Sequence, residues 1–383
     1  MPIHDLGYRK WDGKQGVFWL RWVVIAQGGI RLAWKSQWLK RLMLVAWTPA
    51  ILFGFAFFSY EQFSLLRETN PEVKSWIWRA RISMAEDPEE IVEILKEAEE
   101  NQALDSIQLG FDAQEQWKKI QQRNEVFEDW EEERRLGHRP GPRRGPPPRP
   151  DESNGLSALA PRDLVKDALR DPDVARNDVW AYLLMRFFQY PQGLLMVMVV
   201  GLIAPQLISN DVRSRAFLSY FSRPINRVDY MVGKSAVVWC YLALITTAPA
   251  LVLYFIGVSL SPNWSVVFDT WDLPLRILLA SILLLIPATS LALMFSSLTS
   301  ETRYAQYAWY AVWAMGMVAY LVLLNTGQTW SQVSLFHILW IVQGWVFGLE
   351  DWDAAFMPLM ILLAMTVGSL IILTRRVSAP MRI

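Results

Sequence analysis

The sequence predicts an all-α, polytopic membrane protein with six transmembrane helices and a large helical extracytoplasmic insert between the first two. Composition is the first observation: 53% of the 383 residues are hydrophobic and the mean hydropathy is +0.18, which is too apolar for an ordinary soluble domain. The second is the recurrence of apolar runs of roughly 20 residues, the length that crosses a bilayer as a helix. Within lipid, only helices or closed barrels satisfy the hydrogen bonds of the backbone.

The six expected spans contain no charged residue apart from Arg276, at the edge of the fourth. They occupy residues 42–60, 187–208, 235–258, 274–298, 306–325 and 355–374. Residues 61–186 form the insert, and residues 187–383 form the membrane domain with the second to sixth spans.

Residues 1–41 show no cleavable signal peptide, because their apolar run at 17–26 is interrupted by Arg21 and lacks a small-residue cleavage site. Ile30, Trp34 and Trp38 recur at helical spacing. This spacing predicts one interfacial helix on the cytoplasmic face that leads into the first span. Basic residues surround its apolar face: Arg31, Lys35, Lys40 and Arg41.

The zero net charge of the chain conceals an asymmetry. Residues 61–186 hold 19 Lys or Arg against 27 Asp or Glu, whereas the rest of the chain holds 18 against 10. Short basic connections stay cytoplasmic, while long domains cross regardless of charge. Connection 209–234 and the tail, with Arg375, Arg376 and Arg382, are basic, whereas connections 259–273 and 326–354 contain acidic residues and no Lys or Arg. We therefore expect a multi-pass protein of the plasma (inner) membrane with both termini in the cytoplasm.

Residues 333–349 are apolar enough to form a seventh span, but a seventh span would place the basic tail outside. We therefore expect a shallow re-entrant or interfacial helix pair that is broken near Gly344. Trp340, Trp345 and Trp352 fit this depth, because indole is favoured at the membrane interface.

The insert is expected to consist of helices joined by a linker. A capping pattern, Asp87, Pro88 and Glu90, precedes an apolar face formed by Ile91, Ile94, Leu95 and Ala98. A second helix is expected from Asp112 to Gly137. Residues 139–150 are too rich in proline for regular structure and predict an extended linker, with a partner-docking motif as the alternative. A helical pattern resumes between Asp163 and Gln189 and is expected to run straight into the second span.

Several chemistries are excluded by the residues present. A single cysteine, Cys240, allows no internal disulfide, and His4, His138 and His337 show no spacing typical of metal ligands. The stretch VDYMVGKS resembles the end of a phosphate-binding loop, but Val228 stands where that motif needs its first glycine. We expect no catalytic, cofactor or metal site on this chain and no nucleic-acid partner.

Connection 209–234 combines five basic residues with two acids and the triplet SRP. Here the sequence resembles the ABC-2 class of ABC transporter permeases, in which a span ends in an acidic and basic pair, continues as a short amphipathic helix and re-enters the membrane after an SRP…R…Y…GK pattern. The resemblance covers the membrane part of the chain and not residues 61–186. The residues that carry it are Asp211, Arg213, Ser222, Arg223, Pro224, Arg227, Tyr230, Gly233 and Lys234.

The resemblance implies the membrane subunit of an ABC exporter that works as a homodimer or as paired permeases. ATP and Mg would be held by a separate ATP-binding subunit, and the connection, with Arg215 also on its surface, would act as a coupling helix. Pro224 would stop that helix, and Gly233 would allow close approach at the mouth of the third span.

Three other interpretations remain open. The arginines of the connection could simply contact lipid phosphates. The chain could be a membrane-anchored scaffold that presents the insert to a partner protein. An intramembrane hydrolase would need polar catalytic groups inside the spans, which offer only scattered Ser, Thr, Gln and Asn.

Overall fold

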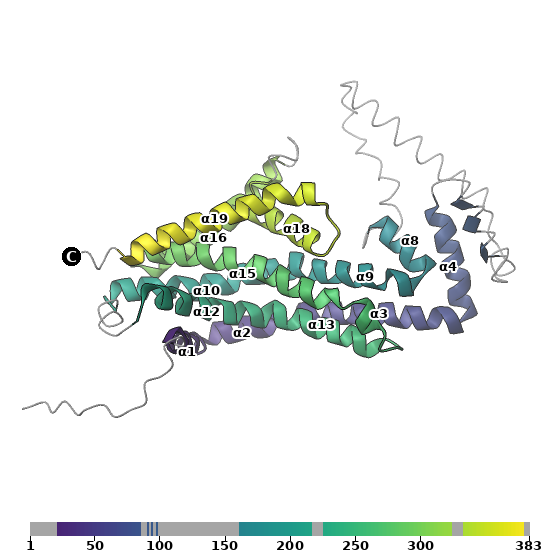
Figure 1. The fold of residues 1–383 in the computed structure, drawn as a ribbon, viewed down its shortest axis with the longest axis horizontal. Coiled ribbons are helices and arrows are strands. Elements are labelled where there is room, and N and C mark those ends of the chain that lie inside the picture. Colours follow the sequence, from purple (N-terminus) through teal and green to yellow (C-terminus); the bar gives the residue numbers. More distant parts are fainter. Residues whose placement is uncertain are drawn as a thin grey trace, which may run out of the picture.

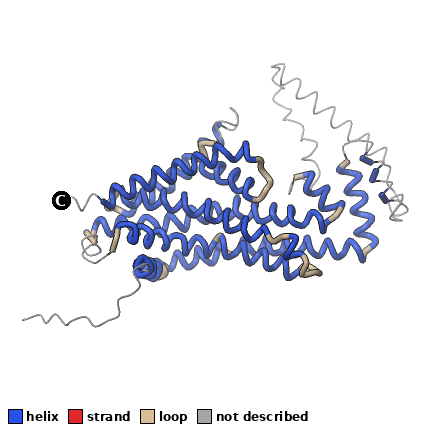
Figure 2. The backbone as a smooth tube through the Cα atoms, viewed as in Figure 1, coloured by secondary structure: helices blue, strands red, loops and turns tan. Residues whose placement is uncertain are grey.

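The computed structural model describes residues 21–85, 90–91, 93–94, 97–98, 161–216, 225–323 and 332–378. Within these ranges all regular structure is helical (Figures 1 and 2). The helices are α1 (Arg21–Ala33), α2 (Gln37–Ala46), α3 (Thr48–Thr69), α4 (Pro71–Met84), α8 (Arg162–Arg170), α9 (Pro172–Phe187), the π-helix η2 (Phe188–Gln192), α10 (Gly193–Arg213), α12 (Arg227–Ile245), α13 (Thr247–Leu260), α14 (Val266–Asp269), α15 (Asp272–Leu298), α16 (Thr302–Leu323), α18 (Leu335–Val346) and α19 (Trp352–Ser378).

Six helical stretches in the described part are long and apolar enough to cross a membrane, which confirms the predicted fold class and number of spans. Helices α2 and α3 together make one stretch, and so do α12 and α13. The six are Gln37–Arg67, Gly193–Arg213, Arg227–Leu260, Asp272–Leu298, Thr302–Leu323 and Trp352–Val377.

The bundle is built around α10 and α15, the two spans whose side chains are mostly buried, whereas few side chains of α3, α16 and α19 are buried, so these helices lie at its edge. Figure 1 shows the end of α10, the start of α12 and the carboxyl end of α19 at one end of the bundle, and α4 and α8 at the other. We call these the basic end and the insert end.

Helix α18 has 12 residues and is a short apolar helix rather than a full span. It reaches about 18 Å at 1.5 Å per residue, which is less than the roughly 30 Å of the hydrocarbon core. The expected break near Gly344 is wrong, because the helix continues to Val346. A Cβ on Gly344 would lie 2.5 Å from Cγ of Glu350, so the absence of a side chain at this glycine lets the side chain of Glu350 pack closely against the helix. The chain turns at Gly348 instead, where φ is +79° and glycine has no steric penalty.

The N-terminal segment forms two helices where one was predicted. Helix α1 ends at Ala33 and α2 begins at Gln37, after Ser36, whose side chain accepts a hydrogen bond of 3.3 Å from Leu39 N. This serine is an N-cap, which favours a new helix start. Helix α1 is seen end-on in Figure 1, so it crosses the bundle axis instead of leading along it into the span.

The chain re-enters the membrane domain through α9, η2 and α10, which are continuous. The expectation of an uninterrupted helix from Asp163 is wrong at Asp171, which ends α8 and caps α9 by accepting a bond of 3.0 Å from Asp173 N. The π-helix η2 is fixed to α18, because Gln189 Nε2 donates to Trp340 O at 3.0 Å and Trp340 Nε1 donates to Gln189 O at 2.9 Å.

Part of the predicted insert lies outside the described residues: Asp87, Pro88, Leu95, the expected second helix from Asp112 to Gly137 and the linker 139–150. The described residues of the expected first helix are helical. Its apolar positions Ile91, Ile94 and Ala98 are buried, as the predicted apolar face requires.

Candidate coupling site at the connection between α10 and α12

The basic connection is described at both of its ends. Helix α10 ends at Arg213, after which Ser214 N donates to Asn210 O at 2.9 Å and Arg215 adopts a φ of 52°. This left-handed conformation is uncommon for a residue other than glycine and turns the chain sharply. Ser222, Arg223 and Pro224 lie outside the described residues.

Helix α12 begins with a capping interaction. Asn226 N donates to Asp229 Oδ2 at 3.2 Å, so a carboxylate lies at the helix N-terminus, where it satisfies a free backbone donor and interacts favourably with the helix dipole. Asp229, the second of the two acids in connection 209–234, therefore orients the chain as it re-enters the bundle.

Asp211, Tyr230 and Lys234 form a cluster that we call the α10–α12 tie. The Tyr230 hydroxyl donates to Asp211 Oδ2 at 2.7 Å, and Lys234 Nζ lies 2.7 Å from the same oxygen. Lys234 Nζ also donates to Leu207 O at 2.7 Å and lies 5.4 Å from the centroid of the Tyr230 ring. Tyr230 and Lys234 are buried and Asp211 is mostly so. These three motif residues contact one another across the two helices.

Helical spacing explains how the α10–α12 tie forms. Leu207 and Asp211 are four residues apart on α10, and Tyr230 and Lys234 are four apart on α12, so each pair shares one helix face. Because an unpaired buried charge is costly, these contacts hold the end of α10 against the start of α12.

The other described basic residues of the motif point outward. Arg213, Arg215 and Arg227 are exposed, and the guanidinium of Arg213 donates to Asn210 Oδ1 at 3.5 Å. The connection therefore presents exposed arginines, while the α10–α12 tie fixes the two helix ends from which they project.

Gly233 makes the close approach that its position predicted. A Cβ at this residue would lie 2.8 Å from Ile25 Cβ and 2.9 Å from Trp22 O. One turn further along α12, Val237 Cγ2 would lie 2.5 Å from a Cβ on Gly29. Helix α1 therefore packs directly on α12, just beside the α10–α12 tie.

Ser296 of α15 holds α10 at the proline inside that helix. Its hydroxyl donates to Pro205 O at 2.8 Å and lies 3.1 Å from both Ile208 N and Ser209 N, while Ser209 Oγ donates to Ser296 O at 2.9 Å. These bonds satisfy backbone groups in the turn that follows Pro205, where a proline inside a helix favours a kink. The sequence contains a proline at position 205, inside a predicted span, but nothing in it identifies Ser296 as the residue that contacts this turn.

The insert end holds a second polar cluster, which the sequence analysis missed. Arg176 Nε lies 3.2 Å from Glu61 Oε1, and Arg176 Nη2 lies 2.6 Å from Asp173 Oδ1. Tyr60 donates to Pro172 O at 2.6 Å. Burial disfavours the charged form of Arg176, but the carboxylates of Glu61 and Asp173 outweigh burial and raise the pKa of Arg176 above its usual value.

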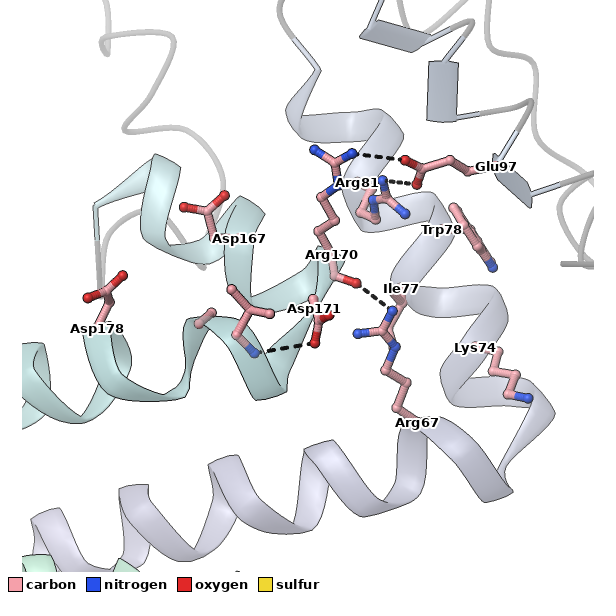
Figure 3. A pocket seen from close by; sticks show the side chains of 12 residues that line it. Arg67, Lys74, Ile77, Trp78, Arg81, Glu97, Asp167, Arg170, Asp171 and Asp178 are labelled. Carbon is pink, nitrogen blue, oxygen red and sulfur yellow. Dashed lines mark hydrogen bonds and ion pairs between the residues drawn. The ribbon is translucent and has the colours of Figure 1, made fainter. Parts of the chain in front are cut away.

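A polar cavity of about 810 Å³ opens beside this cluster, between α3, α4, α8 and α9. Figure 3 shows that Arg81 and Arg170 converge on Glu97, at 2.6 and 3.3 Å, and that Arg67 donates to Arg170 O, at 2.6 Å. The arginines therefore bind to groups of the chain itself. In the described residues no group of three or more His, Cys, Asp or Glu side chains could hold a metal ion.

Comparison with known proteins gives one result. A family model described as ABC-2 family transporter protein matches residues 38–372. Neither the curated proteins nor the solved structures provide a match. The matched region covers four of the candidate spans completely, most of the first and the sixth, and the connection that holds the α10–α12 tie, so the chain belongs to the ABC-2 transporter family and is a membrane subunit of that kind.

Proposed function

We propose that the chain is the permease subunit of an ATP-driven exporter and that the connection between α10 and α12 couples it to a separate ATP-binding subunit. ATP and Mg would be bound by that subunit. The observation that carries the proposal is the exposed basic surface of Arg213, Arg215 and Arg227 on the base formed by the α10–α12 tie. A surface that transmits movement between subunits must itself be fixed to the spans that move.

In this proposal the basic end faces the cytoplasm of a plasma (inner) membrane, because the positive-inside rule places short basic connections there. Closure of the ATP-binding subunits would press on the connection and move α10, which Ser296 links to α15. The exposed apolar faces of α3, α16 and α19 are available to lipid or to a second permease, so we propose a homodimer or a pair of permeases.

The test replaces one exposed arginine at a time by glutamate. Arg213→Glu and Arg227→Glu should each leave insertion and abundance unchanged and lower stimulated ATP hydrolysis of the co-reconstituted ATP-binding subunit sharply. A hydrogen-bonded charge at a protein interface costs about 2–5 kcal/mol when its partner is left unpaired, which is roughly 30-fold or more in binding. An exposed pair contributes at most about 1 kcal/mol.

Arg376→Glu is the matched control, because this exposed arginine lies at the same end of the bundle but outside the connection. The chain purified alone gives the baseline, where no hydrolysis is expected. Equal effects of all three substitutions would reduce the connection to a topological signal. Binding of a partner at the insert end without any dependence on an ATP-binding subunit would favour the scaffold function instead.

A further inference from the structure

A groove of about 740 Å³ lies between α1, the turn that follows it, and α10. Its walls include Ile25, Leu202 and Leu207, and its volume falls within the range of roughly 300–1,000 Å³ that is typical of small-molecule sites. Helix α1, which lines the groove, crosses the bundle near its basic end (Figure 1).

The rim of the groove carries positive charges that no described residue pairs with. Arg31 and Lys35 line the groove and are exposed, and neither has an ion-pair or hydrogen-bond partner for its side chain among the described residues. Lys234, on the floor, is occupied by Asp211 and Leu207 O. Asp211 is the one acid among the described lining residues and is neutralised by Lys234, so the groove attracts anions.

Two tryptophans place the groove at the depth of lipid headgroups. Trp34 and Trp38 flank it and are 45% and 72% exposed, and indole is favoured at the membrane–water interface. Helix α2 continues from here into the first candidate span, Gln37–Arg67. The apolar wall therefore faces the acyl region, and the basic rim faces the phosphate level.

We infer that the groove binds one anionic phospholipid, with its phosphate at Arg31 and Lys35 and one acyl chain along the apolar wall of α10. Basic pockets between membrane helices recognise acidic headgroups in this way. The lipid would fill the space between α1 and α10 as a resident ligand and not as cargo, so this inference does not depend on the proposed transport function.

The charge test uses the full chain, purified in detergent, stripped of lipid and mixed with equal amounts of phosphatidylglycerol and phosphatidylcholine that carry identical acyl chains. Native mass spectrometry measures the ratio of the two bound lipids. Wild type should prefer phosphatidylglycerol, and the double variant Arg31→Gln/Lys35→Gln should lower this preference by roughly 30-fold, which corresponds to about fivefold per basic residue. The double variant Lys40→Gln/Arg41→Gln removes the same charge from α2, outside the groove, and should stay within about twofold of wild type.

A second variant fills the groove without removing charge. A Cβ on Gly28, which lines the groove, meets no atom within 4 Å, so Gly28→Leu should occupy the lipid's place while α1 stays packed. Bound phosphatidylglycerol should be lost. Gly368→Leu in α19 is the control, because a Cβ there also meets no atom within 4 Å and the residue lies outside the groove.

Three results would overturn the inference. Equal losses in the two charge variants would mean general attraction to the membrane surface. Full retention of phosphatidylglycerol by Gly28→Leu would mean that lipid binds elsewhere. An unchanged lipid ratio in Arg31→Gln/Lys35→Gln, together with weaker binding of the ATP-binding subunit in lipid-free detergent, would make the groove a protein contact.

Discussion

The ion pair of the α10–α12 tie, at the basic end, and the pair between Arg176 and Glu61, at the insert end, both join two helices. They differ in how many residues of the chain separate the two partners. Lys234 and Asp211 join helices that are consecutive spans, across one short connection. Arg176 and Glu61 are separated by 115 residues and join the helix that leaves the membrane domain to the one that returns. The first pair shapes a loop surface, whereas the second closes the base of the insert.

The pairs also differ in their surroundings. The side chains of Glu61 and Arg176 are 0% and 7% exposed, while Asp211 is 13% exposed and also accepts a hydrogen bond from Tyr230. Loss of one partner is most costly where the remaining charge has least access to water. The insert end should therefore be the more sensitive to truncation.

Arg176→Met should have the largest effect on stability, because it leaves the carboxyl group of Glu61 buried without its ion-pair partner. We expect a loss of about 3–5 kcal/mol in the free energy of unfolding, measured by denaturant-induced unfolding in detergent. The double variant Glu61→Leu/Arg176→Met removes both charges and should recover most of that loss. If single and double variants are equally unstable, the ion pair is not the cause.

Lys234→Met should have a smaller effect, about 2–3 kcal/mol in the same assay, because Asp211 keeps the Tyr230 hydroxyl and some contact with water. Adding Asp211→Asn should restore part of the stability. A loss as large as that of Arg176→Met would show that the difference in burial between the two ends has no energetic consequence.

Tyr230→Phe should have the smallest effect, about 1.5 kcal/mol, since it removes one hydrogen bond to a carboxylate and keeps the ring in place. Double-mutant analysis with Lys234→Met measures the coupling between the two groups. Additive losses would mean that tyrosine and lysine act on Asp211 independently and that the α10–α12 tie is not cooperative.

Much of the fold was predictable because its signals are local. Six apolar runs of sufficient length, with Arg276 as their one charged residue, identified the spans, and recognising such runs requires no knowledge of long-range contacts. The break before α2 also had a local signal, Ser36 ahead of Gln37, which the periodicity of Ile30, Trp34 and Trp38 obscured.

The site was less predictable, because its residues have two different environments. The spacing of Asp211, Tyr230 and Lys234 indicated a docking surface. In the structure these three side chains lie between α10 and α12, because the face of α10 that carries Asp211 packs against α12. The partnership of Glu61 with Arg176 depends on the path of the whole insert. Sequence spacing identifies residues on one helix face, but not which neighbour that face meets.

The π-helix η2 has a consequence for how the re-entering segment is oriented. A π turn accommodates an additional residue relative to an α turn, and one residue of an α-helix corresponds to about 100° of rotation. Helix α9 is therefore out of phase with α10, although the two form one continuous helical segment. A hydrophobic stripe extrapolated from the buried face of α10 would point to the wrong side of α9. The direction in which Arg176 faces Glu61 thus depends on five residues, Phe188–Gln192, that lie more than three α-helical turns away.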